Sequence, residues 1–448
     1  MYGKLFKNVL YPFYENKIAH RNTPAYINEY QCNLKKTKKE LEVIQLKKLK
    51  DLLRHAYTHC DYYREEWDSL QFDPESVSNI RDIECLPVID KETIRKNYSG
   101  FVAHGYGSDN ISKRTGGSSG APFKFELDQQ SDQRRQAVMW RGYGWLGAGL
   151  GEKALYIWGA NIEPLGFKHA VKEKLYHAFY NRKMLNSFHL NESNIGNYIT
   201  EVNSYKPSII VGYVSPLLIL ADYVLKNSLS IRSPKAILTG AEPLYEFQRE
   251  KIEKAFSAPV YNTYGCREFM LMGAECEVKH GFHLNIDHLV VEVLDEDGNN
   301  KSLSGDLAIT DLHNYGFPLI RYLNGDRGTV SEDELCSCGS PLPLLKSVDG
   351  RRLDVIKTPD GKSIVGEFFP HLLKDFDEIK QFQVIQNSID ELKVKLVLYE
   401  ITLSNKVIEK IKELMRQTLG PSVLISVSIT DHIELTESGK LRVVISRV

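Results

Sequence analysis

A run of small and hydroxyl-bearing residues is the first candidate for chemistry in this sequence. It follows Arg114 and reads Thr115-Gly116-Gly117-Ser118-Ser119-Gly120. Consecutive small residues let backbone N–H groups converge on an anion, and the hydroxyls add further donors. The run is therefore a candidate phosphate-binding loop. The same composition is also typical of a flexible surface linker, so the run by itself leaves both interpretations open.

A second glycine pattern, Gly142-x-Gly144-x-x-Gly147, formally matches the dinucleotide-binding fingerprint. That fingerprint requires a strand before it and a helix after it, whereas the residues that precede Gly142 have the composition of a helix. We therefore predict no dinucleotide site here. The sequence contains no G-x-x-x-x-G-K-[ST] motif, which also disfavours a Walker-type NTPase.

Short polar fragments follow the glycine-serine run in a fixed order. They are Gly240-Ala241-Glu242-Pro243, Tyr264-Gly265-Cys266-Arg267-Glu268, Arg321-Tyr322-Leu323-Asn324-Gly325-Asp326, Gly350-Arg351-Arg352-Leu353-Asp354 and Ser438-Gly439-Lys440. Each is weak alone, but their order and spacing resemble the motifs of the adenylate-forming enzymes, the superfamily of acyl-CoA synthetases and related ligases. The stretches LKKLKDLLRHAYTHCDYYRE and LPVIDKETIRKNY look like the phenylacetate–CoA ligase-like branch, and within it like CapK-type proteins of capsule and polysaccharide biosynthesis. The resemblance runs from about residue 40 to the end of the chain.

The resemblance implies a two-step reaction that uses ATP and Mg²⁺. A carboxylate attacks the α-phosphate of ATP to give an acyl-adenylate and pyrophosphate, and a nucleophile then displaces AMP. AMP is a far better leaving group than oxide, and the site must supply donors and cations for the charge that builds around the α-phosphate. The acceptor is left open between the thiol of CoA and an amine. A catalytically degenerate nucleotide-binding scaffold is the alternative function.

Several residues match the family's nucleotide site. Thr115, Ser118 and Ser119, with the backbone of the neighbouring glycines, would hold the β- and γ-phosphates. Glu242 lies on the adenine-side turn that Gly240, Ala241, Glu242 and Pro243 form, although a glutamate before proline also suits a helix start.

The resemblance also assigns residues to the adenine ring and to the ribose of ATP. Tyr264 would lie along the adenine ring, with Gly265 allowing close approach. Asp326 would accept the ribose hydroxyls, with Arg351 as its partner near the hinge. Asn-Gly-Asp is also ordinary turn composition.

Three side chains are expected to act in the reaction. Glu268 would bind Mg²⁺, a hard cation that takes one carboxylate plus phosphate oxygens. Lys440 would reach into the site and touch the carboxylate and the α-phosphate. Arg267 stands where most relatives carry Ser or Thr, so it is assigned either to the anionic substrate or phosphate, or to a structural ion pair.

A zinc site is also expected. Cys276, Cys336 and Cys338 could complete a tetrahedral S₃N site with one histidine. His280 and His283 compete for the nitrogen position, and the family likeness favours His283. Three thiolates favour a closed structural site rather than a catalytic one. Free thiols are the alternative, since C-x-C is tighter than the usual zinc-knuckle spacing.

These residues need a scaffold, and the pattern of the chain predicts one of the α/β class. Residues 36–66 have helical periodicity, and short apolar runs at 154–158, 208–213, 235–240 and 259–264 alternate with helix-like segments. Residues 288 onward read as a hairpin. We expect a large multi-sheet N-terminal domain over 1–350, helical over about 1–100, and a small mobile α+β domain over 351–448. The acid pocket is expected to draw on Tyr156–Gly159, the turn at 212–216 and residues after Tyr264.

The composition of the chain limits the kinds of partner and the cellular compartment that we expect. Lys and Arg total 57 against 58 Asp and Glu, a formal charge of −1, so no global field draws the chain to nucleic acid. No apolar run is long enough to span a bilayer. Seven cysteines, an odd number in a long chain, do not indicate a secreted disulfide framework, and we expect a cytoplasmic protein. The oligomeric state is left open, a dimer included.

Overall fold

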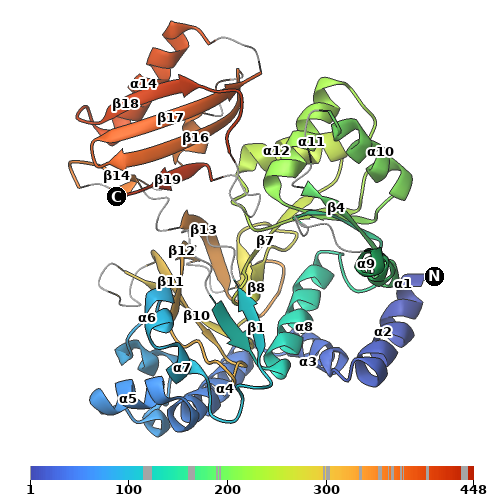
Figure 1. Ribbon diagram of the computed structural model, residues 1–448, viewed down its shortest axis with the longest axis vertical. Helices are drawn as coiled ribbons and strands as arrows, with labels where there is room; N and C mark the ends of the chain where they lie inside the picture. Colours follow the sequence, from blue (N-terminus) through green and yellow to red (C-terminus); the bar gives the residue numbers. More distant parts are fainter. Residues whose placement is uncertain are drawn as a thin grey trace.

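The computed structural model describes residues 2–114, 124–159, 167–187, 190, 193–295, 298, 303–331, 335–351, 356–361, 363–364, 368–373, 376, 378–399, 403–434 and 442–448. Figure 1 shows a lower and right-hand part built from the first 350 residues and an upper left part that contains the C-terminal strands. None of the helices in the described ranges has both the length and the hydropathy that a bilayer crossing requires.

The N-terminal hundred residues are helical, as predicted. The elements are α1 (Tyr2–Leu5), η1 (Phe6–Leu10), α2 (Tyr11–Phe13), η2 (Tyr14–Ile18), α3 (Thr23–Asn33), α4 (Lys38–His59), α5 (Asp61–Ser69), η3 (Pro74–Ser76), η4 (Ile80–Cys85), α6 (Lys91–Lys96) and α7 (Tyr98–Phe101). Helix α4 begins with a capping box, in which the Thr37 hydroxyl accepts the Glu40 N–H and the Glu40 carboxylate accepts the Thr37 N–H. The helical pattern predicted over 36–66 is present, but Cys60 adopts an extended conformation that divides it into α4 and α5.

A hairpin and a long helix lead into the main sheet. The hairpin consists of β1 (Ile111–Arg114) and β2 (Lys124–Leu127), which are antiparallel, and α8 (Gln129–Trp145) follows. Gly142 and Gly144 lie inside α8. The residues before Gly142 are therefore helical, as predicted, and not the strand that the dinucleotide fingerprint requires.

Five parallel strands form one half of an 11-stranded sheet. They alternate with helices in the order β3 (Ala154–Trp158), α9 (Phe167–Phe179), β4 (Arg182–Asn186), α10 (Ile195–Tyr205), β5 (Ile209–Gly212), α11 (Val214–Lys226), β6 (Ala236–Thr239), α12 (Glu246–Phe256) and β7 (Val260–Cys266). Strands β5 and β6 are buried on both faces, because Ile210 and Ile237 pack toward α10–α12 while Ile209 and Leu238 pack toward the end of α8.

The other half of the sheet is antiparallel, and β7 joins the two halves by pairing parallel with β6 and antiparallel with β8. Its strands are β8 (Met270–Ala274), β9 (Phe282–Leu284), β10 (Leu289–Leu294), β11 (Ser304–Asp311), β12 (Tyr322–Val330) and β13 (Leu344–Arg351). The predicted hairpin is present as β10 and β11. The strand order across the whole sheet is β10-β11-β12-β13-β9-β8-β7-β6-β5-β3-β4.

The C-terminal segment forms a separate small α+β unit. It comprises β14 (Ile356–Lys357), β15 (Ser363–Ile364), α13 (Phe368–Leu373), β16 (Ile379–Ser388), β17 (Glu391–Leu398), α14 (Asn405–Leu419), β18 (Leu424–Ile429) and β19 (Val444–Ser446). Its four-stranded sheet has the order β18-β17-β16-β19, and α14 packs its apolar face against a hydrophobic core of this unit alone. A domain boundary after residue 350 stays a proposal, which this separate core supports.

Candidate active site

Aromatic side chains meet where the order of the parallel strands reverses. Strand β3 lies between β4 and β5, so the chain leaves β3 in one direction and returns on its other side. Crevices for ligands form at the carboxyl ends of such strands. Trp158 ends β3 and Tyr213 follows β5, and their ring centroids are 4.1 Å apart. Two of the segments expected to line the acid pocket therefore come together at this point.

Glu242 lies on the turn after β6 and contacts the start of α11. Its carboxylate accepts the Ser215 N–H at 2.7 Å and the Ser215 hydroxyl at 3.1 Å. It therefore satisfies a backbone donor in the first turn of α11, which the sequence interpretation did not foresee. Burial raises the pKa of Tyr213 to about 12, with Glu242 adding to the rise, while the Gly159 backbone and the Arg267 charge oppose it. The turns after β3, β5, β6 and β7 thus surround one tyrosine.

Tyr264, Asn324 and Asp326 form one hydrogen-bonded group. The Tyr264 hydroxyl donates to Oδ2 of Asp326 at 3.0 Å, and Nδ2 of Asn324 donates to the same oxygen at 2.8 Å and to the Tyr264 hydroxyl at 2.9 Å. Burial, reinforced by Asp326, raises the pKa of Tyr264 far above its usual range, so the phenol stays a donor. These bonds fix the Asp326 carboxylate on β12, where the Asp326 backbone pairs in register with Arg351 of β13.

Glu268 is only 4% exposed and lies beside the same group. Its Oε1 accepts the Tyr322 hydroxyl at 3.1 Å and lies 4.0 Å from the Lys91 ammonium nitrogen. Burial, together with the Glu268 and Asp326 charges, raises the pKa of Tyr322 well above its usual range. Glu268 therefore accepts the Tyr322 hydroxyl directly, while the Asp326 charge is close enough to act on the same phenol.

The tight hairpin between β7 and β8 carries Arg267 and Glu268, and a side chain of α8 contacts its backbone. A Cβ at Gly265 would stand 1.8 Å from the Met270 carbonyl oxygen, and Met270 itself adopts φ 62°. Glycine at 265 is therefore required by the backbone of the hairpin. Nη2 of Arg135, from α8, donates to the Arg267 carbonyl at 2.5 Å. The Arg267 side chain is exposed, and no ion pair joins it to another described residue.

Part of the predicted site lies outside the described residues. Thr115–Gly120, which the hairpin of β1 and β2 brackets, and Lys440 belong to this part. The side chain of Arg351 does too, although its backbone is placed by β13. The roles of these residues stay predictions.

The four predicted zinc ligands come together. Their ligand atoms, from Cys276, His283, Cys336 and Cys338, lie within 4.8 Å of one another. The Sγ atoms of Cys276 and Cys336 are 3.7 Å apart, and Cys338 Sγ is 3.3 Å from His283 Nε2. Tetrahedral zinc with ordinary bond lengths places two thiolates about 3.8 Å apart and a thiolate and an imidazole nitrogen about 3.5 Å apart.

The histidine in this group is oriented as a ligand. His283 Nδ1 contacts the Leu342 carbonyl oxygen at 3.2 Å, and because a carbonyl only accepts, Nδ1 carries the proton and Nε2 points its lone pair at the sulfurs. His280 is exposed and is not part of the group. The residues present therefore fit a structural zinc ion, with His283 as the nitrogen ligand.

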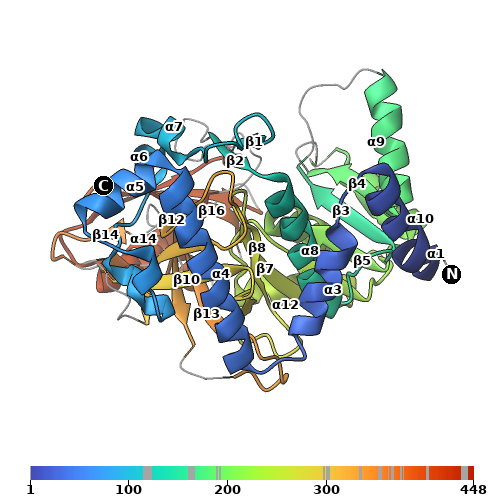
Figure 2. The ribbon, with the colours of Figure 1, turned by 90° about the horizontal axis from the view of Figure 1, so that it is seen from below.

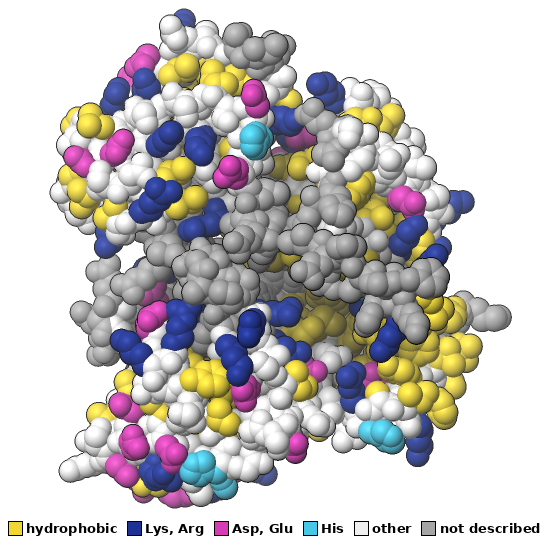
Figure 3. All heavy atoms as spheres, in the orientation of Figure 1, with side chains coloured by type: hydrophobic (Ala, Val, Ile, Leu, Met, Phe, Trp, Pro, Cys, Tyr) yellow, Lys and Arg dark blue, Asp and Glu magenta, His cyan; other side chains and the backbone are white. Residues whose placement is uncertain are grey.

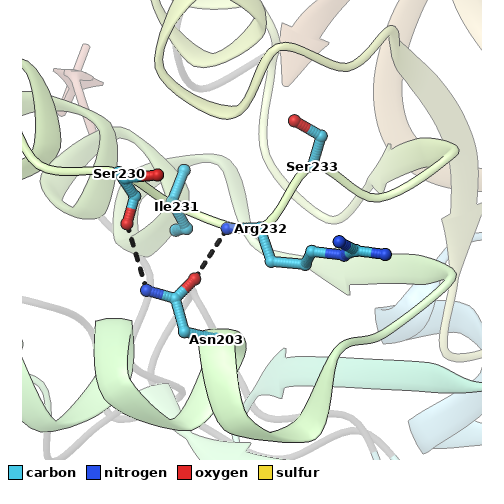
Figure 4. A pocket seen from close by; sticks show the side chains of 5 residues that line it. All are labelled: Asn203, Ser230, Ile231, Arg232 and Ser233. Atoms are coloured by element: carbon cyan, nitrogen blue, oxygen red, sulfur yellow. Dashed lines mark hydrogen bonds between the residues drawn. The ribbon is translucent and has the colours of Figure 1, made fainter.

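The surface also carries a cavity of about 520 Å³ that is unrelated to these residues. Asn203, Ser230, Ile231, Arg232 and Ser233 line it (Figure 4). Asn203 bridges the loop by donating to the Ser230 carbonyl at 3.0 Å and accepting the Arg232 N–H at 2.6 Å. No carboxylate or histidine lies among the residues that line this cavity to act as a base, and we assign the cavity no function.

Comparisons with known proteins show what the chain is similar to. Residues 356–447 match the model of the CapK C-terminal domain family. Over 442 residues the chain is 25% identical to protein CapK of Staphylococcus aureus, covering 96% of this chain and 94% of that protein. This chain is a relative of CapK and of the phenylacetate–CoA ligases. The phenylacetate-coenzyme A ligase of Aromatoleum evansii is 25% identical over 307 residues, or 65% of this chain and 67% of that enzyme.

Solved structures agree on the fold of this CapK relative. A 2-hydroxyisobutyryl-CoA ligase in its postadenylation state superposes with a TM-score of 0.68 at 20% identity, covering 90% of this chain and 88% of that one. The amide bond synthetase McbA of Marinactinospora thermotolerans gives 0.54 at 15% identity, over 75% and 67%. The predicted fold class, that of the adenylate-forming enzymes, is confirmed.

Sequence reasoning missed several residues of the site in this CapK relative. Tyr322 and Asn324 lie inside a quoted motif, yet only the hydrogen bonds to Glu268 and Asp326 reveal what they do. Lys91 and Arg135 lie in segments to which no site role was given, and Ser215, in the turn expected to line the acid pocket, was not expected to contact Glu242. The spacing of those segments from the motifs, such as 177 positions between Lys91 and Glu268, gives no local signal.

Arg135 is expected to position the catalytic hairpin. The variant Arg135→Lys keeps the charge but loses the planar donor at the Arg267 carbonyl, and a lost bond to a charged donor is worth about 1.5–3 kcal/mol. We expect the maximal rate of adenylate formation to fall about tenfold or more with little change in the Michaelis constant for ATP.

The matched control is Arg134→Lys on the same helix, because Arg134 is equally buried but pairs with Glu29 at 3.0 Å, away from the hairpin. Thermal unfolding of both variants separates a loss of stability from a loss of rate. Equal rate losses in the two variants would contradict a positioning role for Arg135.

Proposed function

We propose that this chain activates a carboxylic acid as its acyl-adenylate with ATP and then transfers the acyl group to a thiol or an amine. Two hydrogen bonds between separate motifs carry the proposal: Tyr264 donates to Asp326 and Tyr322 donates to Glu268. The relatives support it, because three of those matched in sequence are phenylacetate-coenzyme A ligases.

In the first step, a carboxylate oxygen of the acid attacks the α-phosphorus of ATP and pyrophosphate leaves. In the second, the sulfur of a thiol or the nitrogen of an amine attacks the acyl carbon, AMP leaves, and the nucleophile loses its proton to the surrounding base or water. Asp326, fixed by Tyr264 and Asn324, would accept the ribose hydroxyls. Mg²⁺ bound by Glu268 would neutralise charge on the triphosphate.

Two acceptor classes remain within the proposal. The hydroxyisobutyryl-CoA ligase that shares the fold was solved with CoA, and McbA is an amide bond synthetase, so this scaffold serves both thiols and amines. The likeness to CapK supports a role in capsule or polysaccharide assembly, where an amide on a sugar or amino acid is a suitable product.

Carboxylate-dependent exchange between ATP and pyrophosphate tests the first step. A panel of acids that includes uronic, amino and aryl acids should contain at least one that supports exchange, and mass spectrometry with CoA or amines should then identify the second product. ATP binding without exchange for any acid would favour the alternative, a nucleotide-holding scaffold in a biosynthetic complex.

We also propose that Cys276, His283, Cys336 and Cys338 hold a structural zinc ion that ties the segment 336–342 to strands β8 and β9. The two thiolates of Cys336 and Cys338 lie on this segment, and His283 reaches its far end through the Leu342 carbonyl. The ion would form four coordinate bonds to segments about 50 residues apart in sequence. Only the folded chain brings these segments together.

Loss of this ion is expected to destabilise the protein. The variant Cys336→Ser should contain less than about a tenth of an equivalent of zinc and unfold at a midpoint about 5 °C lower or more, because the metal's binding energy contributes to folding. Elemental analysis and thermal unfolding measure the two effects.

Cys85→Ser, at an exposed cysteine outside the group, is the matched control and should change neither the zinc content nor the unfolding midpoint. Wild-type protein without zinc and with all thiols titratable would overturn the assignment.

A further inference from the structure

The N-terminal helix, by which we mean the consecutive α- and π-helical turns α1, η1, α2 and η2 over residues 2–18, carries exposed apolar side chains, and so does α9. Eight large hydrophobic side chains on these two segments are at least 40% exposed, among 16 such residues in the whole described chain. They are Tyr2, Leu5, Val9, Phe13, Ile18, Val171, Leu175 and Tyr176. Such a concentration within two short segments is unusual for a surface that only water covers. We call these eight residues the apolar ridge.

The two segments that carry the ridge pack against each other. Tyr2, Leu5, Val9 and Phe13 recur every three or four residues along one side of the N-terminal helix. Val171 and Leu175 continue on α9 at the same spacing toward Phe179. Phe179 then packs against Phe6 and Tyr14, with ring centroids 5.1 Å apart in both pairs, and its carbonyl accepts the Tyr2 hydroxyl.

The fold places the ridge at an edge of the molecule. Figure 2 shows α9 standing beside the N-terminal helix at the outer end of the parallel half of the sheet, away from the C-terminal strands. Hydrophobic side chains gather along this edge in Figure 3, at the right of the view, with Lys and Arg side chains close to them. The candidate active site lies elsewhere, at the carboxyl ends of β3, β5, β6 and β7.

The charged side chains on these segments indicate what kind of partner the apolar ridge contacts. Five of their described side chains are exposed lysines, namely Lys4, Lys7, Lys17, Lys172 and Lys174. Only Glu173 is an exposed acid, since Glu15 is buried. The chain as a whole is electrically balanced, so this surplus is local. A symmetric contact between two copies would place these lysines against each other, whereas an anionic lipid surface complements them.

We propose that the apolar ridge docks this protein on the surface of an anionic bilayer. The apolar side chains enter the boundary between headgroups and acyl chains, while the lysines contact lipid phosphates. Neither segment spans the membrane. Docking of this kind would hold the enzyme at a lipid surface and leave the carboxyl ends of the parallel strands accessible to small molecules.

Sedimentation of the full-length protein with vesicles tests the proposal. Vesicles of phosphatidylcholine with about one third phosphatidylglycerol should bind it about tenfold or more tightly than vesicles of phosphatidylcholine alone, and high salt should release it. Lys4→Ala and Lys7→Ala should each weaken binding about fivefold, the factor that corresponds to one lysine near such a surface.

The apolar part is tested by the triple variant Leu5→Gln/Val9→Gln/Phe13→Gln, which should weaken binding about tenfold or more. Val43→Gln/Leu70→Gln/Leu229→Gln, at equally exposed hydrophobic positions off the ridge, should bind as the wild type does. Thermal unfolding verifies that both variants are folded.

Three results would overturn the proposal. The first is wild-type protein that stays in the supernatant with both kinds of vesicle. The second is equal binding by the two triple variants. The third is a wild-type dimer in light scattering that only the ridge variant dissociates, which would make the ridge a contact between copies of the chain.

Discussion

Replacement of Glu268 by glutamine is expected to lower carboxylate-dependent ATP–pyrophosphate exchange about a thousandfold. Glutamine keeps the size of the side chain and can still accept the Tyr322 hydroxyl, which lies 3.1 Å away. It lacks the charge that a hard divalent cation requires. Exchange measured over a range of Mg²⁺ concentrations should show that half-maximal activity needs more Mg²⁺ in the variant than in the wild type.

Glu275→Gln is the matched control, since Glu275 is as buried as Glu268 but pairs with Arg249 at 2.7 Å. We expect this variant to be less stable, because it leaves a buried guanidinium poorly compensated, yet to keep its Mg²⁺ dependence. A loss of exchange in Glu268→Gln below about threefold, or an unchanged Mg²⁺ dependence, would remove Glu268 from the metal site.

The variant Lys440→Ala is expected to lower adenylate formation by at least about two orders of magnitude while largely sparing the affinity for ATP. A lysine that touches the carboxylate and the α-phosphate stabilises charge that develops only as the new bond forms, so its loss affects the rate rather than nucleotide binding. Rapid-quench measurement of the adenylate, together with equilibrium binding of ATP, separates the two quantities.

Lys393→Ala provides the comparison, because Lys393 is an exposed lysine of the same C-terminal unit, on β17. Its removal should change neither rate nor affinity. If Lys440→Ala lowers ATP affinity as much as it lowers the rate, Lys440 contributes uniform binding and its assigned role is wrong.

The parallel half of the sheet could be predicted because its signals are local. The run that became β5 is apolar at every position, which is typical of a strand covered by helices on both faces, and the amphipathic segment after it became α11. The break at Cys60 could not be predicted, because residues on both sides continue the helical periodicity. Cys60 is completely buried, and its thiol donates to the Phe101 carbonyl at 3.7 Å, a contact 41 positions away in sequence.

The four candidate zinc ligands show how the sequence and the tertiary structure each contribute to defining a site. The sequence supplied three cysteines and two candidate histidines, because soft ligands in close pairs are visible in a sequence. Only the packing of β9 against β13 placed the ring of His283 among the sulfurs and left His280 in solvent. A choice between histidines three residues apart depends on the direction in which a strand points each side chain.

The sequence alone determined which residue types this protein brings to its chemistry and the α/β class of the scaffold, since motif order and hydrophobic period belong to the covalent chain. The tertiary structure decided which of these residues meet and how they are held. Tyr322 reaches Glu268 and Arg135 supports the hairpin of Glu268 only because a parallel and an antiparallel half share β7. Hydrogen bonds act over about 3 Å in space whatever the separation in sequence, so these contacts exist only once the chain has folded.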